Sequence, residues 1–209
     1  MRKKLTELSA ELARNLIDDD GNNTWPDFLN FLFTLANSNS VVLKENALLV
    51  FSLVPGIFGN QQSNYLDVIK QMLAHSFANE TYSVRFHAAK AFACFITDHE
   101  KEESILKHFS ELMPHYMKAM EESVHGEEDD TLLKMAIEIV GLSPKSMRPH
   151  LGAFLQLCLG IAKEESVDDD WSHLALECAI SAAESTPGAV KKVGGHLLPH
   201  FVQLVSLVL

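Results

Sequence analysis

Apolar residues recur at helical spacing along most of the chain, and the clearest case is the stretch from Tyr82 to Ile96. One face of this predicted helix carries Val84, Ala88, Ala91, Phe92 and Phe95. Apolar positions separated by three and four residues are typical of an amphipathic helix. The small alanine side chains allow a close approach of neighbouring helices. We therefore expect this helix to pack against others on more than one flank.

Similar helices end at regular intervals. Val54 precedes Pro55-Gly56, Ser143 precedes Pro144, and Thr186 precedes Pro187-Gly188. A proline just beyond a last turn cannot continue a helix. The helix described above ends near residue 97, so the four ends lie about 43, 46 and 43 residues apart. Helix pairs that recur every 40–47 residues or so are typical of HEAT and armadillo repeats.

The sequence thus predicts an all-α fold, a HEAT-repeat α-solenoid in which antiparallel helix pairs stack into a right-handed superhelix. We expect residues 1–209 to form a single array. Its parts are a lone second helix at 4–18, helix pairs at 25–54, 63–97, 105–143 and 147–186, and a lone first helix at 195–209. Pro114 should kink the helix that contains it. Because the apolar segment 202–209 would lie bare at one end of such an array, we expect a fragment of a longer protein.

Composition narrows the function classes. The net charge of −11 argues against nucleic acid or an anionic membrane as the main partner, since both favour a basic surface. No segment resembles a signal peptide or is long enough to cross a bilayer. Cys94, Cys158 and Cys178 lie in apolar helical contexts, which indicates reduced core cysteines in a cytosolic or nuclear protein.

No sequence motif indicates an enzyme, a cofactor site or a metal centre. His196 and His200 have the i, i+4 spacing of a zinc pair, but Pro199 lies between them and the sequence places no third ligand. The turn after Asp18 lacks the glycine and glutamate that a calcium loop needs at its sixth and twelfth positions. We therefore predict no catalytic residues, no cofactor and no metal.

Two candidate interaction surfaces remain. Acidic residues cluster in the turns inside the third and fourth helix pairs and could form an acidic ridge that steers a basic partner. This acidic ridge comprises Glu127, Glu128, Asp129, Asp130, Glu164, Glu165, Asp168, Asp169 and Asp170. Polar positions of the second helices should line the concave surface that solenoids use for binding. This candidate concave surface comprises Lys44, Glu45, Asn46, His87, Lys90, Lys134, Glu138, His173 and Glu177. Ordinary solvent exposure or helix capping is the alternative for each residue.

Several segments resemble the importin-5 branch (karyopherin beta-3, Ran-binding) of the importin-beta superfamily. They are residues 11–18, the turn 20–23 with Trp25-Pro26, residues 55–62 with 65–70, Lys107-His108-Phe109 and Arg148-Pro149-His150-Leu151. The similarity is specific in the first 70 residues and looser afterwards. It is lost near 124–131 and 171–195.

This resemblance implies a fragment from the N-terminal half of a nuclear import receptor. Such a receptor binds Ran in its GTP form, basic protein cargo and Phe-Gly nucleoporins. It acts as a monomer that shuttles between cytoplasm and nucleus, with no nucleic acid partner and no membrane insertion. A HEAT-repeat scaffold that organises a multiprotein enzyme complex stays open as the alternative, and dependence on the nucleotide state of Ran would separate the two.

Overall fold

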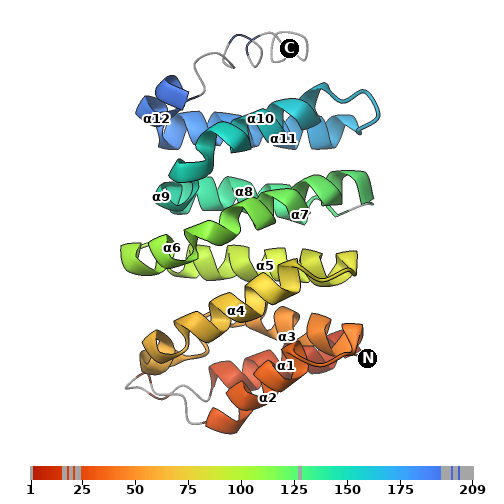
Figure 1. Ribbon diagram of the computed structural model, residues 1–209, viewed down its shortest axis with the longest axis vertical. Coiled ribbons are helices and arrows are strands. Elements are labelled where there is room, and N and C mark those ends of the chain that lie inside the picture. The colour runs from red at the N-terminus through yellow and green to blue at the C-terminus, as the bar shows by residue number, and fades with distance from the viewer. Residues whose placement is uncertain are drawn as a thin grey trace. The chain divides into compact units, whose positions relative to one another are not determined.

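The computed structural model describes residues 2–15, 18, 21, 25–126, 129–193, 199 and 202. Within these residues the chain is helical and contains no strand. The chain divides into two compact units, Met1–Asp98 and His99–Leu209, each of which is built from packed helix pairs (Figure 1). The predicted all-α, HEAT-type fold is confirmed. The prediction of a single array stays a prediction, because each unit is described by itself.

The first unit contains five α-helices and one 3₁₀ helix among its described residues. These are α1 (Arg2–Arg14), α2 (Pro26–Ala36), α3 (Val41–Leu53), the 3₁₀ helix η1 (Gly59–Asn64), α4 (Leu66–Phe77) and α5 (Tyr82–Asp98). Helix α2 pairs with α3, and α4 pairs with α5, while α3 also packs against both α1 and α5. The second helices of successive pairs therefore form one continuous layer within this unit.

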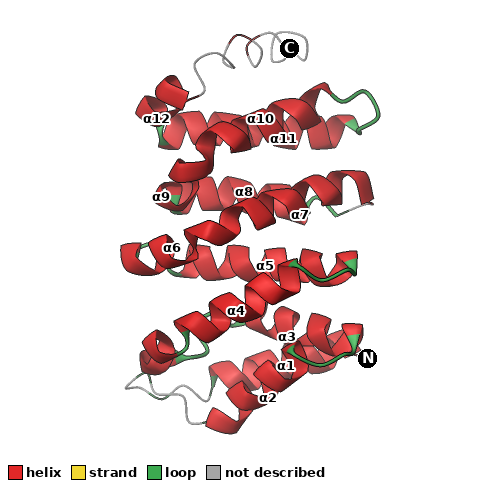
Figure 2. Cartoon of the chain, viewed as in Figure 1, coloured by secondary structure: helices red, strands yellow, loops and turns green. Residues whose placement is uncertain are grey.

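The second unit repeats this arrangement, but its first helices are interrupted by 3₁₀ turns. Figure 2 shows that short loops join its successive helices. Its elements are α6 (Glu103–Phe109), η2 (Ser110–Leu112), α7 (Met113–Gly126), α8 (Thr131–Leu142), α9 (Pro144–Met147), η3 (Arg148–His150), α10 (Leu151–Lys163), α11 (Asp169–Ser185) and α12 (Pro187–Val193). Helix α11 packs against α8 and α10, and α7 packs against α10.

Helix α5 has the apolar face that the sequence predicts. Its alanines Ala88, Ala89 and Ala91 are completely buried, and so are Phe92 and Phe95. The helix contacts α3 on one side and α4 on another, which confirms the expected packing on more than one flank. An alanine at these positions lets the helix axes approach more closely than larger side chains would allow.

The ends of the second helices share one backbone geometry. Val54, Ser143 and Thr186 have φ/ψ of −137°/68°, −126°/53° and −138°/56°, outside the α region, as expected for a residue that precedes proline. In each case the carbonyl of this residue accepts a hydrogen bond from the amide three positions later, at 3.0–3.1 Å. This repeated turn stops one helix and directs the chain into the next.

His99 occupies the equivalent place in the remaining pair, because its carbonyl accepts a 2.9 Å hydrogen bond from the Glu102 amide. The four turns then begin at residues 54, 99, 143 and 186, which are 45, 44 and 43 residues apart. This spacing is more regular than the one estimated from residue 97. The sequence alone does not reveal this turn, because Glu100 stands where the other three have proline.

The first helices differ from the prediction of uninterrupted segments. Pro114 lies at the second position of α7, directly after a 3₁₀ turn that separates α7 from α6, which confirms the expected kink. The predicted helix at 147–163 is likewise broken, with Pro149 in the middle of η3. Pro144 both ends α8 and opens α9, since proline is well accommodated in the first turn of a helix.

Pro187 opens a helix in the same way, so α12 occupies residues where the sequence predicted a connecting turn. The predicted helix at 195–209 lies outside the described residues apart from Pro199 and Val202. Helix α1 ends at Arg14, and its Ala10 and Ala13 are buried. Leu8 and Leu12 of the same helix are about half exposed, at 56% and 49%.

Candidate interaction surface

The first part of the acidic ridge lies before α8, and its described carboxylates have local roles. Asp129 accepts hydrogen bonds from the backbone amide of Thr131, at 3.0 Å, and from the hydroxyl of the same residue. Asp130 forms an ion pair of 2.7 Å with Lys134, one turn further along the helix. Glu127 and Glu128 lie outside the described residues. The described carboxylates here therefore stabilise the start of α8.

The second part of the ridge lies between α10 and α11. The Asp168 carboxylate accepts a 2.9 Å hydrogen bond from the Asp170 amide and so caps α11. Glu164 accepts hydrogen bonds from His125 at 3.0 Å and from Ser166 at 2.8 Å. Glu165, Asp169 and Asp170 are exposed, with no side-chain partner among the described residues. Among the described residues of the ridge, these three carboxylates are the ones available to a ligand.

The contact between His125 and Glu164 joins the last turn of α7 to the end of α10. Hydrogen bonding to the Glu121 carbonyl, followed by the contact with Glu164, raises the pKa of His125. Hydrogen bonding from Ser166, followed by that from His125, lowers the pKa of Glu164. Both shifts favour the charged forms, so the pair is an ion pair at mildly acidic pH.

The candidate concave residues of the first unit are half-buried between neighbouring helices. Glu45 of α3 accepts a hydrogen bond from the Ser83 hydroxyl of α5. The Nδ1 atom of His87 lies 2.8 Å from the Ser83 carbonyl, and the Lys90 ammonium lies 5.5 Å from the centre of the Phe86 ring. Lys44 and Asn46 are also half-buried. Glu45 thus links α3 to α5, whereas the contacts of His87 and Lys90 lie within α5.

The candidate residues of the second unit have a different environment. Lys134 and Glu138 of α8 are exposed, as are His173 and Glu177 of α11. Helices α8 and α11 pack against each other, so these four side chains belong to adjacent helices. The structure thus places a mixed-charge, solvent-accessible surface on the second helices of this unit.

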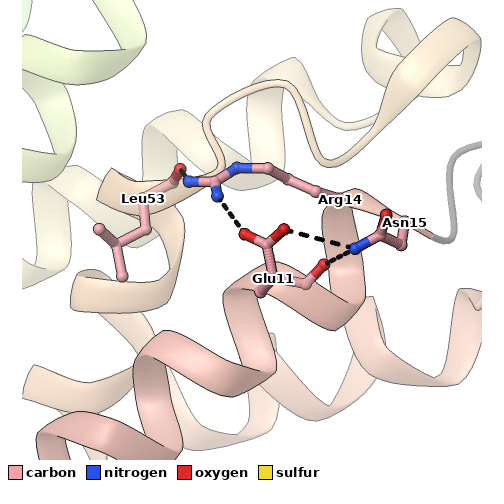
Figure 3. Close-up of polar contacts among 4 residues, drawn as sticks. All are labelled: Glu11, Arg14, Asn15 and Leu53. Carbon is pink, nitrogen blue, oxygen red and sulfur yellow. Dashed lines mark hydrogen bonds and ion pairs between the residues drawn. The ribbon is translucent and has the colours of Figure 1, made fainter.

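Sequence reasoning missed the polar contacts between successive repeats. Figure 3 shows one of them, in which the Arg14 guanidinium donates to the Leu53 carbonyl at 2.8 Å and pairs with Glu11 at 2.6 Å. The same Glu11 lies beside Asn15, whose amide donates to the Glu11 carbonyl at 2.8 Å. Arg14 and Leu53 are 39 residues apart, so only a search at the repeat offset could have found this contact.

The second unit has comparable contacts at similar offsets. Lys145 pairs with Glu103 at 3.1 Å, and the Nε2 atom of His150 lies 3.0 Å from the Ser110 carbonyl. A groove of about 410 Å³ lies between α7 and α10, lined by Pro114, Met117, Lys118, Glu121, Ala153, Gln156 and Leu157. The sequence contains no local signal for this groove, because its walls come from two repeats.

The three cysteines are free thiols, and Cys158 and Cys178 are buried. Burial raises the pKa of the Cys158 thiol well above its ordinary value, with a smaller contribution from the neighbouring Cys178. Within the described part of the chain, no three metal-ligating side chains converge, and no helix is long and apolar enough to cross a bilayer. His196 and His200 lie outside that part.

A family model described as IPO5-like, TPR repeats matches residues 1–157, about three quarters of the chain. The chain belongs to this family. TPR repeats have a period of about 34 residues, whereas the turns here recur at 43–45 residues, in the range of HEAT repeats. The family lies within the importin-beta superfamily, as the resemblance implied.

Solved structures of the karyopherin Kap121p share the fold. A triple mutant of Kap121p matches with a TM-score of 0.75 and 20% identity over 98% of this chain and 19% of that one. Kap121p bound to Nup53p matches with a TM-score of 0.69 and 19% identity over 88% of this chain and 17% of that one. Kap121p bound to Pho4p gives the same values. The chain thus spans about a fifth of Kap121p.

Proposed function

We propose that this chain is a segment of a nuclear transport receptor of the importin-5 branch. The observation that carries the proposal is the family match over residues 1–157, which is supported by helix pairs of HEAT period. Solved structures show Kap121p bound to Nup53p, Ste12p and Pho4p. By analogy, this segment contributes part of a surface for Ran-GTP, basic protein cargo and Phe-Gly nucleoporins while shuttling between cytoplasm and nucleus.

The surface of the second unit supports a role in binding basic cargo. Glu165, Asp169 and Asp170 are exposed at one edge, and Glu138 and Glu177 are exposed on the second helices. With a net charge of −11, the chain attracts cationic segments over distances comparable to the Debye length, about 8–10 Å at physiological salt. Such attraction raises association rates more than it lengthens the lifetime of a complex.

The groove between α7 and α10 supports a separate role in binding Phe-Gly segments. Met117 and Leu157 contribute apolar side chains, and the volume of about 410 Å³ is ample for a phenylalanine ring. In this proposal one ring enters the groove while the chain on either side stays extended. Replacing Leu157 by Asp should abolish retention on a Phe-Gly peptide resin and leave the far-ultraviolet circular dichroism unchanged.

The decisive test of the receptor class is binding to Ran. This chain is immobilised and titrated with Ran loaded with GTP and, in parallel, with GDP. Tighter binding of the GTP form is expected for a transport receptor. Equal binding of the two forms would contradict the proposal and favour a scaffold, since a scaffold that organises an enzyme complex has no reason to distinguish them.

The proposed role of the exposed ridge residues Asp169 and Asp170 in cargo binding can be tested without disturbing the fold. Because Asp168 caps α11, the appropriate variant replaces only Asp169 and Asp170 by Asn. We expect this variant to bind a lysine-rich peptide more slowly, with a shallower dependence of the association rate on salt. Glu7 and Glu80, both exposed in the first unit, provide a control when replaced by Gln, since the net charge changes equally. Equal effects of the two variants would argue against a localised site.

A further inference from the structure

A cationic pocket lies in the second unit, where the second helices α8 and α11 end. It has a volume of about 420 Å³ and lies between two successive repeat turns, those that begin at Ser143 and at Thr186. Its charged lining residues are Lys145, Arg148 and Lys192, and no carboxylate is among the residues that line it. Three cations thus line one pocket in a chain whose net charge is −11, and Glu103 lies beside only one of them, Lys145.

The fold does not require cations at these positions. The equivalent turn of the first unit continues from Val54 through Gly56, Ile57 and Phe58, and the last two side chains are buried. The turn that begins at His99 continues through Glu100, Lys101, Glu102 and Glu103, which is predominantly acidic. Lys145 therefore has a cationic counterpart in Lys101. At the positions equivalent to Arg148 and Lys192, five and six residues after the start of the turn, the other two turns have Gly59 and Asn60, and Ser104 and Ile105. A structural role in the turn does not explain Arg148 and Lys192.

The cationic side chains that line the pocket are also largely accessible to a ligand. Lys145 forms an exposed ion pair with Glu103 at 3.1 Å, which contributes little in water. Arg148 and Lys192 are exposed, with no ion pair to any residue that the structure describes. The rest of the lining is formed mainly by small side chains and prolines, and a Cβ added at Gly188 would meet no atom within 4 Å. A ligand can therefore approach both cations directly.

We propose that this pocket binds an acidic segment of a partner protein. Arg148 presents a planar guanidinium suited to a bidentate contact with a carboxylate, and Lys192 and Lys145 supply point charges for further carboxylates. The pocket is open and larger than a single small anion needs, which favours several acidic side chains of one extended peptide. This ligand is opposite in charge to the basic cargo proposed above, so the inference stands independently of that function.

The location of the pocket keeps the two ligands apart. The cationic pocket lies where α8 and α11 end, whereas the acidic residues Glu165, Asp169 and Asp170 lie where α11 begins. Helix α11 has 17 residues, and at 1.5 Å per residue its two ends are about 25 Å apart. This separation exceeds the Debye length at physiological salt, so the cationic pocket and the acidic residues act as separate binding sites.

The test measures binding of a fluorescent Glu-rich dodecapeptide to the whole chain by anisotropy at low salt. The unmodified protein should bind this peptide more tightly than a Gln-rich peptide of equal length. Arg148→Glu combined with Lys192→Glu should weaken binding at least tenfold. The control, Lys4→Glu combined with Lys163→Glu, makes the same change of net charge at exposed positions elsewhere on the chain, and it should weaken binding less than threefold.

Three results would overturn the proposal. The first is no binding of the Glu-rich peptide to the unmodified chain, and the second is an equal loss in the two charge-reversed variants. The third is a concentration-dependent dimer in sedimentation that disappears in the Arg148 and Lys192 variant, because the pocket would then serve a second copy of the chain. Circular dichroism of each variant verifies that the helices are retained.

Discussion

At the scale of single residues, most described carboxylates of the acidic ridge already form hydrogen bonds or ion pairs within the protein. Asp129 and Asp168 accept hydrogen bonds at helix starts, and Asp130 and Glu164 form ion pairs. A ligand that used these groups would have to compete with those contacts. Exposure and the lack of a local partner therefore distinguish Glu165, Asp169 and Asp170 within a set that looks uniform in the sequence.

The ion pair of His125 and Glu164 predicts a pH-dependent stability. The raised pKa of His125 gives a contribution that is fully present below the ordinary histidine value of 6.5 and is lost as pH rises through the raised value. The lowered pKa of Glu164 gives a contribution that is present above 4.5 and is lost as pH falls through the lowered value. The stability difference between the unmodified chain and His125→Gln should be largest between these two pH values.

Urea denaturation over a series of pH values measures this difference. His173→Gln is the matched control, since His173 is exposed in the same unit and has no hydrogen bond or ion pair to any described residue. Its stability difference from the unmodified chain should stay constant with pH. A constant difference for His125→Gln as well would mean that the ion pair contributes nothing in solution.

At the scale of elements, the turn after each second helix is the recurrent unit of the structure. A residue outside the α region is followed by proline in three of the four turns, and the same backbone hydrogen bond closes all four. The exception is His99, which is followed by Glu100. The closing hydrogen bond is thus shared by all four turns, although the residue that follows the first position is not.

This comparison predicts that Glu100→Pro is tolerated and stabilising. Proline at this position restricts the unfolded chain and matches the turn of the other repeats, so we expect a gain of about 0.4–1 kcal/mol in the free energy of unfolding. The loss of the exposed pair between Glu100 and Lys101, at 3.7 Å, should cost little. Thermal or urea unfolding measures the change.

Glu102→Pro provides the contrasting variant. The Glu102 amide donates the hydrogen bond that closes this turn, at 2.9 Å from the His99 carbonyl. Proline has no amide hydrogen, so this substitution should lower stability. If Glu100→Pro were as destabilising as Glu102→Pro, the turn at His99 would not be equivalent to the other three.

At the scale of the whole molecule, the repeat fold has consequences for unfolding. In a repeat protein each repeat contacts only its neighbours, so stability is approximately a sum of local terms. The chain has two tryptophans: Trp25 lies before α2 in the first unit, where it stacks on Phe28, and Trp171 lies in α11 of the second. The fluorescence of each tryptophan therefore reports on the unfolding of one unit.

We expect the two units to unfold at different urea concentrations. The Trp171→Phe variant reports through Trp25 alone, and Trp25→Phe reports through Trp171 alone, so the two fluorescence curves should have distinct midpoints. Circular dichroism of either variant should span both transitions. Coincident midpoints for fluorescence and circular dichroism would instead indicate one cooperative unit and would support the predicted single array.

The sequence by itself determined the fold class and the positions where helices stop. These features are local: a proline forbids continuation of a helix wherever it occurs, and the alanine and phenylalanine pattern of α5 defines its buried face within a few turns. The interruption before α10 and the helix at Pro187 were missed because proline also opens helices. Proline alone does not distinguish the end of one helix from the start of the next.

Only the tertiary structure decided which charged residues are engaged and which are available. Arg148 and Lys192 are 44 residues apart and line one pocket, and Arg14 reaches a carbonyl 39 residues away. Such contacts depend on how successive repeats stack, which is set by packing between side chains of different repeats. The sequence of one repeat therefore does not predict which residues of the neighbouring repeat will contact it.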